Sequence, residues 1–264
     1  MADPVVSVLM GVRDGGRWLS TAIQSLLGQT LGDLELIVVD DGSTDDTPAL
    51  LSAVRDPRLV VERQARAGLA VALNRALERA RAPLLARLDA DDVALPARLE
   101  RQRAFLQAHP DVGLLGTAAR VIDETGRDVG MVRPPEDDRA IRRALIRRNP
   151  FVHSSIMLRR TLAIAAGGYD ISFPVAQDYD LWLRLSAVTR MANLPEPLVV
   201  RRLVPGRVTA ARDDERLRAE ARARWRAVRR GDYPPWAVPF ALRPLLALAL
   251  PGPLRGSLRR ALGR

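Results

Sequence analysis

Three carboxylates fall within four residues in the segment Asp89-Ala90-Asp91-Asp92. Charges of one sign held this closely repel each other unless a cation or solvent relieves the repulsion. Mg²⁺ and Mn²⁺ suit such a site, because they prefer oxygen ligands and accompany phosphate groups. The alternative is a solvated acidic turn that caps the helix expected near Pro96, since short acidic triplets are common. The structural context of the segment therefore decides between a metal site and a turn.

A second acidic segment, Asp40-Asp41-Gly42-Ser43, has residue types that suit nucleotide binding. A carboxylate there can accept the imide N–H of uracil or a ribose hydroxyl, and the glycine lets the backbone approach a nucleotide closely. The same residues also suit an ordinary turn with Asx and N-cap hydrogen bonds. Two acidic loops at neighbouring strand ends support each other, so we expect both to face one ligand.

A candidate general base, Asp178, lies within the segment from Gln177 to Trp182. A general base must lie within about 2.6 to 3.2 Å of the group whose proton it takes, and a carboxylate can serve as one. The alternative for Asp178 is a helix N-cap. Trp182 is either a core residue or an aromatic platform for a sugar face. His153 is either structural or a group that orients the acceptor or the diphosphate.

Four short apolar stretches precede or separate these acidic segments, at residues 5–10, 34–39, 58–62 and 84–88. Apolar residues recur with helical spacing between them, over residues 19–27 and 69–80. Strands that alternate with helices predict a parallel sheet covered on both faces, which binds ligands beyond the carboxyl ends of its strands. Both acidic segments fall at such ends.

The second half of the chain has a different pattern. Residues 112–121 and 129–132 flank a Glu-Thr-Gly turn and predict a β-ribbon, so the sheet is expected to be mixed. Helices are expected over residues 96–108, 138–147, 179–186 and 213–230, and an extended segment over 152–158. We therefore expect a catalytic domain over 1–205, made of a nucleotide-binding half (1–108) and an acceptor half (109–205), and a basic, amphipathic tail over 206–264.

The composition narrows the metal chemistry and the partners. The chain has no cysteine and only two histidines, which excludes thiolate sites and argues against a histidine-rich zinc centre. Residues 201–264 hold 16 arginines and five acidic residues, whereas the rest of the chain is nearly neutral. An amphipathic, arginine-rich tail fits an anionic membrane surface. Nucleic acid is not an expected partner, because aromatic residues do not alternate with the basic ones.

No stretch reaches the roughly 18 apolar residues needed to cross a bilayer. The apolar stretch over residues 236–254 is interrupted by prolines and by Arg243, and we expect it to lie on a membrane. The N-terminal residues lack the basic start and apolar centre of a signal peptide. We therefore expect a cytoplasmic protein that is peripheral on the inner face of the cell membrane.

Together, these motifs resemble the family 2 glycosyltransferases of the GT-A fold over roughly residues 4–205. The resemblance rests on five segments in order: VSVLMGVRDG (6–15), SLLGQTLGDLELIVVDDGSTDDT (25–47), ARLDADDVALPARLERQ (86–102), HSSIMLRR (153–160), and GGYD followed by QDYDLWLRL (177–185). It implies an α/β fold with a Rossmann-like, mixed and mostly parallel sheet flanked by helices.

The resemblance also implies roles for individual residues. Asp41 is expected to contact the nucleotide base, Asp89 the ribose side and Asp91 the metal, with Asp178 as the general base. The nucleotide-sugar site is also expected to include Gly11, Arg13 and Gly68, and the acceptor site His153 and Trp182. The implied reaction is a single inverting displacement in which Asp178 deprotonates the acceptor hydroxyl and Mg²⁺ or Mn²⁺ stabilises the departing nucleoside diphosphate.

The chain departs from the family pattern at three places. Gly11 and Arg13 replace the usual proline and aromatic residue, so the guanidinium plane of Arg13 is left to stack on the base. Gln177 replaces the glutamate before the base, which keeps the hydrogen bonding and loses a charge. The segment 222–225, Arg-Ala-Arg-Trp, is similar to the Gln-x-x-Arg-Trp motif of processive synthases, but Ala221 replaces the glutamine and no spanning helices follow. We interpret this segment as part of a merely basic helix and expect non-processive transfer.

The expected function is transfer of a sugar from a UDP-linked donor to a glycan or lipid-linked acceptor in cell-surface polysaccharide synthesis. A sugar-nucleotide pyrophosphorylase is one alternative, but it needs a glycine-rich phosphate loop with an activating basic residue, for which residues 11–16 are a poor candidate. The other alternative is a catalytically inactive, membrane-docked nucleotide-binding protein.

Overall fold

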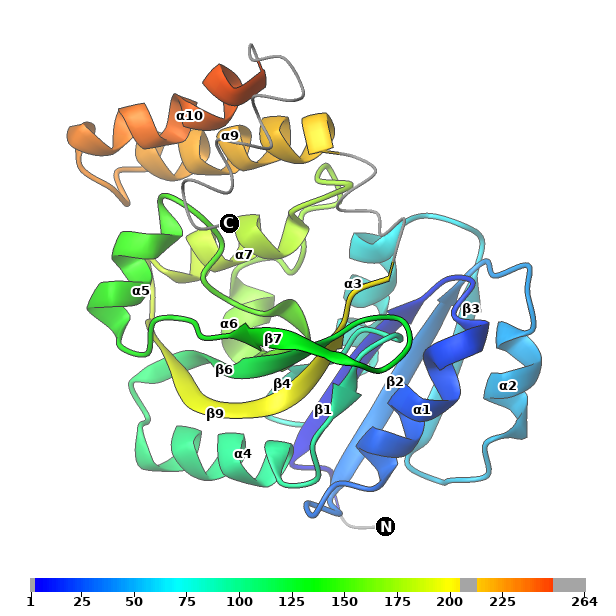
Figure 1. Cartoon of the computed structure of the whole chain (residues 1–264). Coiled ribbons are helices and arrows are strands. Elements are labelled where there is room, and N and C mark those ends of the chain that lie inside the picture. The colour runs from blue at the N-terminus through cyan, green and yellow to red at the C-terminus, as the bar shows by residue number, and fades with distance from the viewer. Residues whose placement is uncertain (1–2, 205–212, 249–264) are drawn as a thin grey trace.

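The computed structural model describes residues 3–204 and 213–248. Within these ranges one mixed sheet contains β1 (Val6–Val12), β2 (Leu34–Asp41), β3 (Leu59–Gln64), β4 (Leu84–Arg87), β5 (Val93–Ala94), β6 (Val112–Ile122), β7 (Asp128–Val132), β8 (Met157–Arg159) and β9 (Arg190–Arg202). The strand order is β3-β2-β1-β4-β8-β6-β9-β5, and β7 pairs with β6 (Figure 1). The predicted mixed sheet is confirmed.

Helices cover both faces of this sheet. They are α1 (Gly16–Leu27), α2 (Thr47–Ala53), α3 (Leu69–Arg79), α4 (Arg98–Ala108), α5 (Asp138–Leu145), α6 (Arg160–Ala165), α7 (Gln177–Leu185), α9 (Asp213–Arg229) and α10 (Val238–Leu248), with single 3-10 turns η1 (His153–Ser155) and η2 (Pro235–Ala237). The apolar side chains of α1, α2 and α4 share one core, and those of α3, α5 and α7 share the other.

Strands β1 to β4 form the parallel part of the sheet. Val8 and Met10 of β1 face the core under α1, whereas Leu9 faces the core under α3. Every residue of β1, β2 and β4 is buried, which explains why these stretches are nearly continuously apolar instead of alternating. β2 and β4 lie on either side of β1, so the acidic residues at the end of β2 and those just after β4 lie at the same edge of the sheet.

The second part of the sheet mixes strand directions. β4 pairs antiparallel with β8, β8 pairs antiparallel with β6, and β9 runs parallel to β6. β9 was not among the predicted elements, because Pro195 and Pro197 interrupt its apolar pattern and its register against β6 shifts near Ala118. β4 belongs to the predicted nucleotide-binding half (1–108) and β8 to the predicted acceptor half (109–205), and the two strands pair, so one sheet spans both halves. The division into two halves stays a prediction.

The predicted extended segment over 152–158 is wrong in its first half. Residues 153–155 form the turn η1, closed by a 2.8 Å hydrogen bond from the backbone N–H of Ser155 to the carbonyl of Val152. This turn buries the side chains of both Ser154 and Ser155, which a regular strand would direct to opposite faces.

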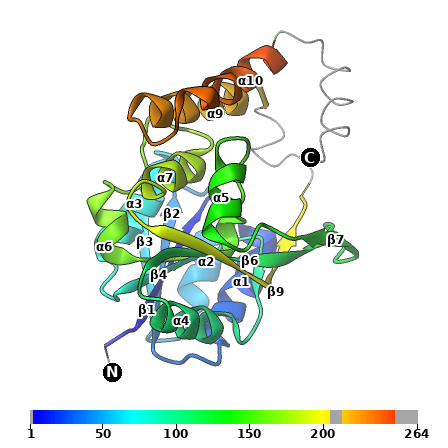
Figure 2. The ribbon, with the colours of Figure 1, turned by 90° about the vertical axis from the view of Figure 1, so that its left-hand side faces the viewer.

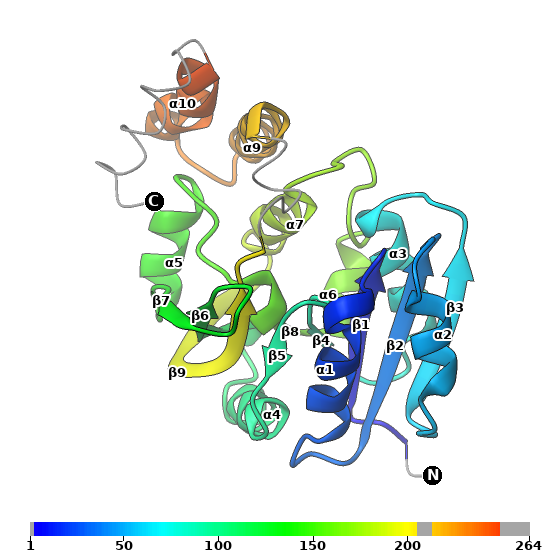
Figure 3. The same cartoon turned by 45° about the vertical axis from the view of Figure 1, so that its right-hand side comes forward.

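Helices α9 and α10 lie outside α7, with α9 between α7 and α10 (Figures 2 and 3). The predicted basic helix over 213–230 is confirmed as α9, but the interpretation of its arginines as merely basic is wrong for Arg224, whose side chain is 1% exposed. No helix in the described part of the chain has the length and apolar character that crossing a membrane requires. The remainder of the expected tail, residues 206–212 and 249–264, lies outside the described residues.

Candidate active site

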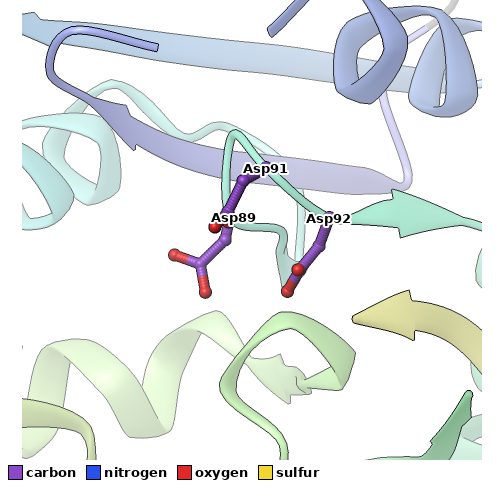
Figure 4. Close-up of side chains that lie close together, drawn as sticks. All are labelled: Asp89, Asp91 and Asp92. Atoms are coloured by element: carbon purple, nitrogen blue, oxygen red, sulfur yellow. The ribbon is translucent and has the colours of Figure 1, made fainter. Parts of the chain in front are cut away.

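The acidic segment after β4 forms a turn whose carboxylates gather in a small volume. Asp89, Asp91 and Asp92 each offer a carboxylate oxygen, and these oxygens lie within 4.8 Å of one another. Figure 4 shows the side chains of Asp89 and Asp92 extending from the turn to the same side. The turn is closed by a hydrogen bond of 3.2 Å from the backbone N–H of Asp92 to the carbonyl of Asp89. The structure thus brings the three predicted carboxylates together.

The hydroxyl of Ser154 joins this acidic turn to η1. Its Oγ accepts the backbone N–H of Asp89 at 3.1 Å and the Nη1–H of Arg87 at 3.2 Å. Its own proton can be donated to Asp89 Oδ2, at 3.0 Å, or to Asp92 Oδ2. Because a hydroxyl carries one proton, it serves one of these carboxylates at a time. Ser154 is therefore a shared partner of the turn, a role that the sequence did not indicate.

Arg87 places a buried positive charge beside the same turn. Its side chain is 1% exposed and forms an ion pair with Asp89. Burial acts to lower the pKa of Arg87, but the charge of Asp89 and its hydrogen bond raise that pKa above the ordinary value, so the guanidinium stays protonated. Sequence reasoning missed Arg87. The available signal was a charged residue inside an apolar strand, which is costly to bury unless it is paired.

Arg202 contacts the turn from the end of β9. Its backbone N–H donates to Asp92 Oδ1 at 2.8 Å, and its Nε donates to the carbonyl of Asp91 at 3.3 Å. Its guanidinium lies 3.8 Å from the centre of the Trp18 ring on α1, in a cation–π arrangement. Neither Arg202 nor Trp18 was predicted, because residues far apart in sequence meet here.

Asp41 anchors the loop between β3 and α3. Oδ1 of Asp41 accepts the side-chain N–H of Gln64 at 2.8 Å and the backbone N–H of Ala67 at 2.7 Å, and Oδ2 accepts the N–H of Gly68 at 2.8 Å. Gly68 precedes α3 with a φ of 100°, a conformation that favours glycine. A carboxylate offers about four acceptor positions, so roughly one remains for a ligand N–H. Nucleotide contact by Asp41 and Gly68 stays a prediction.

The loop after β1 is held against the loop after β2. The backbone N–H of Asp14 donates to Ser43 Oγ at 2.9 Å, and Asp14 Oδ1 accepts the N–H of Thr44 at 2.8 Å. Arg13 is exposed beside it, 3.6 Å from the Asp14 carboxylate. Arg13 is therefore available to a ligand at this edge, and its contact with a nucleotide stays a prediction.

Gly11 has a packing role in the structure. It is buried in β1, and a Cβ at this position would lie 2.8 Å from Leu69 Cδ1 and 3.3 Å from Ala72 Cβ. The absence of a side chain therefore lets α3 approach β1 closely. The expected contact of Gly11 with the nucleotide-sugar stays a prediction.

Asp178 is the second residue of α7, and its carboxylate is oriented by a neighbouring loop. Asn149 Nδ2 donates to Asp178 Oδ2 at 2.7 Å. Burial raises the pKa of Asp178 above its ordinary value of 3.8, opposed by the backbone N–H of Tyr179, the charge of Arg87 and the bond from Asn149, and assisted by the charge of Asp89. The turn η1 links the two segments, because Ser154 bonds to Asp89 and the ring of the adjacent His153 packs edge-on against Trp182 of α7. The acidic turn and α7 therefore both contact η1, and the role of Asp178 as the base stays a prediction.

The residue before α7 is held in a sparsely populated conformation. Ala176 has a φ of 58°, in the left-handed region that favours glycine. In the described part of the chain, the other non-glycine residue with positive φ is Asp14, at 50°. Both residues flank the candidate site, where such strain of about 1 to 3 kcal/mol persists only if the surroundings fix it.

The two predicted acceptor residues differ in exposure. Trp182 is 0% exposed and packs edge-on against Phe151 and His153, so the prediction of an aromatic platform for a sugar is wrong: the ring belongs to the core. His153 is partly exposed, and its Nε2 lies 3.1 Å from the hydroxyl of Tyr169. Burial and the charge of Arg87 hold the pKa of His153 well below 6.5, so the ring is neutral at neutral pH. Its contact with an acceptor stays a prediction.

Comparison with known sequences gives consistent matches. The profile of glycosyl transferase family 2 matches residues 7–166. The amylovoran biosynthesis glycosyltransferase AmsE of Erwinia amylovora is 35% identical over 188 residues, which cover 69% of each chain. The O-antigen biosynthesis glycosyltransferase WbnJ of Escherichia coli is 31% identical over 186 residues, which cover 69% of this chain and 71% of the relative.

Two solved structures share the fold. The mannosyltransferase PcManGT from Pyrobaculum calidifontis, in complex with GDP-Man and Mn²⁺, has a TM-score of 0.66 at 23% identity over 100% of this chain and 80% of that one. S. aureus TarS 1-349, in complex with UDP-GlcNAc, has a TM-score of 0.69 at 18% identity over 83% of this chain. This chain spans 65% of the TarS 1-349 chain. These likenesses confirm the expected fold.

Proposed function

The chain belongs to glycosyl transferase family 2, and we propose that it transfers a sugar from a nucleotide-sugar donor to a hydroxyl group by a single inverting displacement. The observation that supports this proposal most is that η1 connects two distant segments: Ser154 bonds to Asp89 of the acidic turn, and the adjacent His153 packs against Trp182 of α7, the helix that carries Asp178. An acidic turn suited to a metal and a diphosphate thus contacts the same short turn as the helix that carries a carboxylate suited to take a proton. Membership of the family sets the pyrophosphorylase alternative aside.

The proposed chemistry assigns the proton transfer to Asp178. Its carboxylate accepts the proton of the acceptor hydroxyl while the hydroxyl oxygen attacks the anomeric carbon and the bond from that carbon to the donor phosphate breaks. Asn149 orients the carboxylate through its 2.7 Å hydrogen bond. The raised pKa of Asp178 supports this role, because a more basic carboxylate is a stronger proton acceptor once it is ionised.

The acidic turn fits a divalent metal by the chemistry of its donors. The clustered ligand atoms are carboxylate oxygens, the set that Mg²⁺ and Mn²⁺ prefer. We assign Asp91 as the metal ligand and Asp89 as a contact to the ribose side of the donor. A bound Mg²⁺ or Mn²⁺ would stabilise the negative charge that develops on the departing nucleoside diphosphate.

We propose a UDP-linked donor and a glycan or lipid-linked acceptor in cell-surface polysaccharide synthesis. Asp41 retains acceptor capacity for one N–H, as the imide of uracil requires. Relatives named for amylovoran biosynthesis and O-antigen biosynthesis support the polysaccharide. The solved relatives hold either UDP-GlcNAc or GDP-Man, so the base is the first feature to test.

A panel of donors tests this proposal. UDP-glucose, UDP-N-acetylglucosamine and GDP-mannose are each added with Mn²⁺, and the melting temperature and the release of nucleoside diphosphate are measured. Saturation by one donor is expected to raise the melting temperature by roughly 5 °C or more. Asp91→Ala should lose the Mn²⁺-dependent part of that shift. Donor binding without turnover, with every acceptor tried, would support the inactive alternative instead.

We also propose that the protein attaches peripherally to an anionic membrane, at the cytoplasmic face. Trp236, Leu242, Leu245 and Leu246 are exposed at or near α10, and the region is rich in arginine. Exposed apolar side chains flanked by basic residues suit the interface of an anionic bilayer.

Sedimentation with vesicles tests this attachment. We expect binding to phosphatidylglycerol vesicles, weaker binding to phosphatidylcholine vesicles, and loss of binding in the double variant Leu245→Ser with Leu246→Ser. Val129→Ser, which changes an exposed apolar residue on β7, is the matched control. Equal binding by the double variant and by the control variant would refute the role of α10.

A further inference from the structure

Helix α9 packs directly on α7, the helix that carries Asp178 (Figures 1 and 3). The buried face of α9 contains Ala219, Ala223 and Ala227, which belong to the same apolar cluster as Tyr179 of α7. Small side chains at four-residue spacing let the two helices approach closely. Such a face needs no charged group to pack, yet α9 places one there.

That charged group is Arg224, whose side chain is 1% exposed. Its Nε donates to the hydroxyl of Tyr179 at 2.8 Å, one terminal nitrogen donates to Glu220 at 2.7 Å, and the other donates to the carbonyl of Phe240 at 3.2 Å. The Tyr179 hydroxyl in turn donates to the carbonyl of Leu145 at the end of α5. A continuous chain of hydrogen bonds therefore runs from α10 through α9 and α7 to α5.

Burial of the Arg224 side chain opposes folding unless its contacts offset the lost hydration. Removing a guanidinium from water is costly, and apolar residues of similar volume often pack as well or better. Three hydrogen bonds, one of which is also the ion pair with Glu220, offset that cost. What the arginine adds beyond apolar packing is a fixed position of Tyr179, the residue next to Asp178.

Arginines of α9 also hold the loop that leads into α7. Arg222 donates to the carbonyl of Ser172 at 2.8 Å and to its Oγ at 2.7 Å, and its guanidinium lies 3.9 Å from the ring centre of Phe173. Arg226 forms an ion pair of 2.6 Å with Asp170. The loop therefore has two anchors on α9 within the few residues before α7 begins.

This loop ends at Ala176, the residue with a left-handed φ of 58° immediately before α7. A non-glycine residue keeps such a conformation only where neighbouring contacts determine the path of the chain. α9 supplies contacts on both sides of Asp178: the anchors at residues 170–173 before it, and the Tyr179 hydroxyl after it.

We infer that α9 is a positioning element of the active site and that Arg224, acting through Tyr179, sets the placement of Asp178. The inference rests on the proposed role of Asp178 as the base. It assigns to the C-terminal helices a function within catalysis that is separate from membrane attachment. It also gives a role to the Arg-Trp segment of the sequence, whose arginine faces inward here.

The test removes the arginine without leaving a buried charge. In the full chain, Arg224→Met is combined with Glu220→Leu, which replaces the ion pair by apolar residues of similar size and should keep α9 folded. We expect kcat to fall on the order of 10- to 100-fold while KM for the donor stays within about twofold, because a small displacement of a catalytic group costs rate more than binding. The assay follows release of nucleoside diphosphate from UDP-N-acetylglucosamine and GDP-mannose with Mn²⁺.

Two further variants make the test specific. Tyr179→Phe removes the hydroxyl from the other side of the contact, so combining it with the α9 double variant should add no further loss. Arg218→Ala changes an exposed arginine of the same helix and should leave kcat unchanged. An unchanged kcat in the double variant, or an equal loss in Arg218→Ala, would overturn the inference.

Amide hydrogen exchange gives a readout that needs no turnover. In the α9 double variant, residues 170–180 should exchange faster than in the unmodified protein, whereas α1 should exchange at its original rate. Unchanged exchange over 170–180 overturns the inference even if no donor is turned over. If Asp178→Asn keeps normal transfer while the double variant loses it, the assignment of the base fails and the structural role of α9 stands.

Discussion

Asp41 and Asp89 reach the candidate site from the ends of parallel strands, whereas Asp178 reaches it from a helix that several distant elements hold in place. The strands β2 and β4 pair directly with β1 along their length, so their ends are fixed by backbone hydrogen bonds. The start of α7 is fixed by side chains: Asn149 on the carboxylate of Asp178, and Arg224 on the adjacent tyrosine.

This difference separates two tasks of the enzyme. The proposed donor side is built on the ends of the parallel strands, and its loops are tied to one another, as when Ser43 and Thr44 bond to Asp14. The base side depends on contacts between elements that are remote in sequence. We therefore expect changes on the base side to alter the rate of transfer with little effect on donor binding, and changes on the donor side to alter binding as well.

The largest expected effect comes from Asp178→Asn, which separates the two sides most directly. Loss of a general base typically costs 10²- to 10⁴-fold, so we expect kcat to fall by about 10³-fold. The dissociation constant of the donor, measured by calorimetry with Mn²⁺, should stay within about twofold. A comparable loss of donor affinity would show that the two sides are not separable.

The stability of the same variant provides a control. Because burial raises the pKa of Asp178 above 3.8, the native state binds more protons than the unfolded state between 3.8 and the native pKa, and stability falls as pH rises through that window. At neutral pH, Asp178→Asn removes this unfavourable ionisation. Its melting temperature should therefore equal or exceed that of the unmodified protein, and a large decrease would mean that lost rate reflects lost structure.

The position of Asp41 and Asp89 at strand ends could be predicted from sequence because that information is local. An apolar run followed at once by acidic residues specifies a strand and the side chains at its end, as at Asp41 and Asp89. Arg87 was missed although it interrupts an apolar strand, because that signal does not say which residues pair with the charge, and its partners include Ser154, far along the chain.

The base side could be predicted only in part. The motif around Asp178 led to the residue that we propose as the base, but not to the elements that hold it, since α9 docks through Arg224, which the sequence presents as one of many arginines. Trp182 was left open between a core residue and a sugar platform, because an aromatic ring near a candidate base has the same sequence signature in both cases, and its burial favours the core. Burial depends on packing between α7 and its neighbours, which no local pattern contains.

A smaller effect is expected for Ser154→Ala, which changes the residue of η1 that bonds to the acidic turn. The hydroxyl bonds to the backbone of Asp89 and to carboxylates of the acidic turn, so its loss loosens the turn that we propose to hold the metal. Changes behind metal ligands typically cost 10- to 100-fold in affinity, and we expect a loss of about tenfold for Mn²⁺, measured by calorimetric titration.

The neighbouring serine is the matched control for this measurement. Ser155 is equally buried, but its hydroxyl bonds to Thr117 and Val152, away from the turn. Ser155→Ala should lower the melting temperature and leave Mn²⁺ affinity unchanged. Equal affinities in the two variants would mean that Ser154 supports the fold and not the turn.

The smallest expected effect is a shift of the pH profile, confined to the base side. The proposed mechanism requires ionised Asp178, so kcat should fall as pH decreases through the pKa of this carboxylate, which lies above 3.8 because of burial. Asn149→Leu removes a hydrogen bond to the ionised form of Asp178, which raises the pKa of Asp178 further and should move the acidic limb of the kcat profile to higher pH.

His153→Gln is the control for this shift. His153 stays neutral because its pKa lies well below 6.5, so His153→Gln should lower or preserve kcat without moving the acidic limb. If the limb moves in His153→Gln and not in Asn149→Leu, the titrating group is not Asp178, and the rate is controlled from the side of the acidic turn.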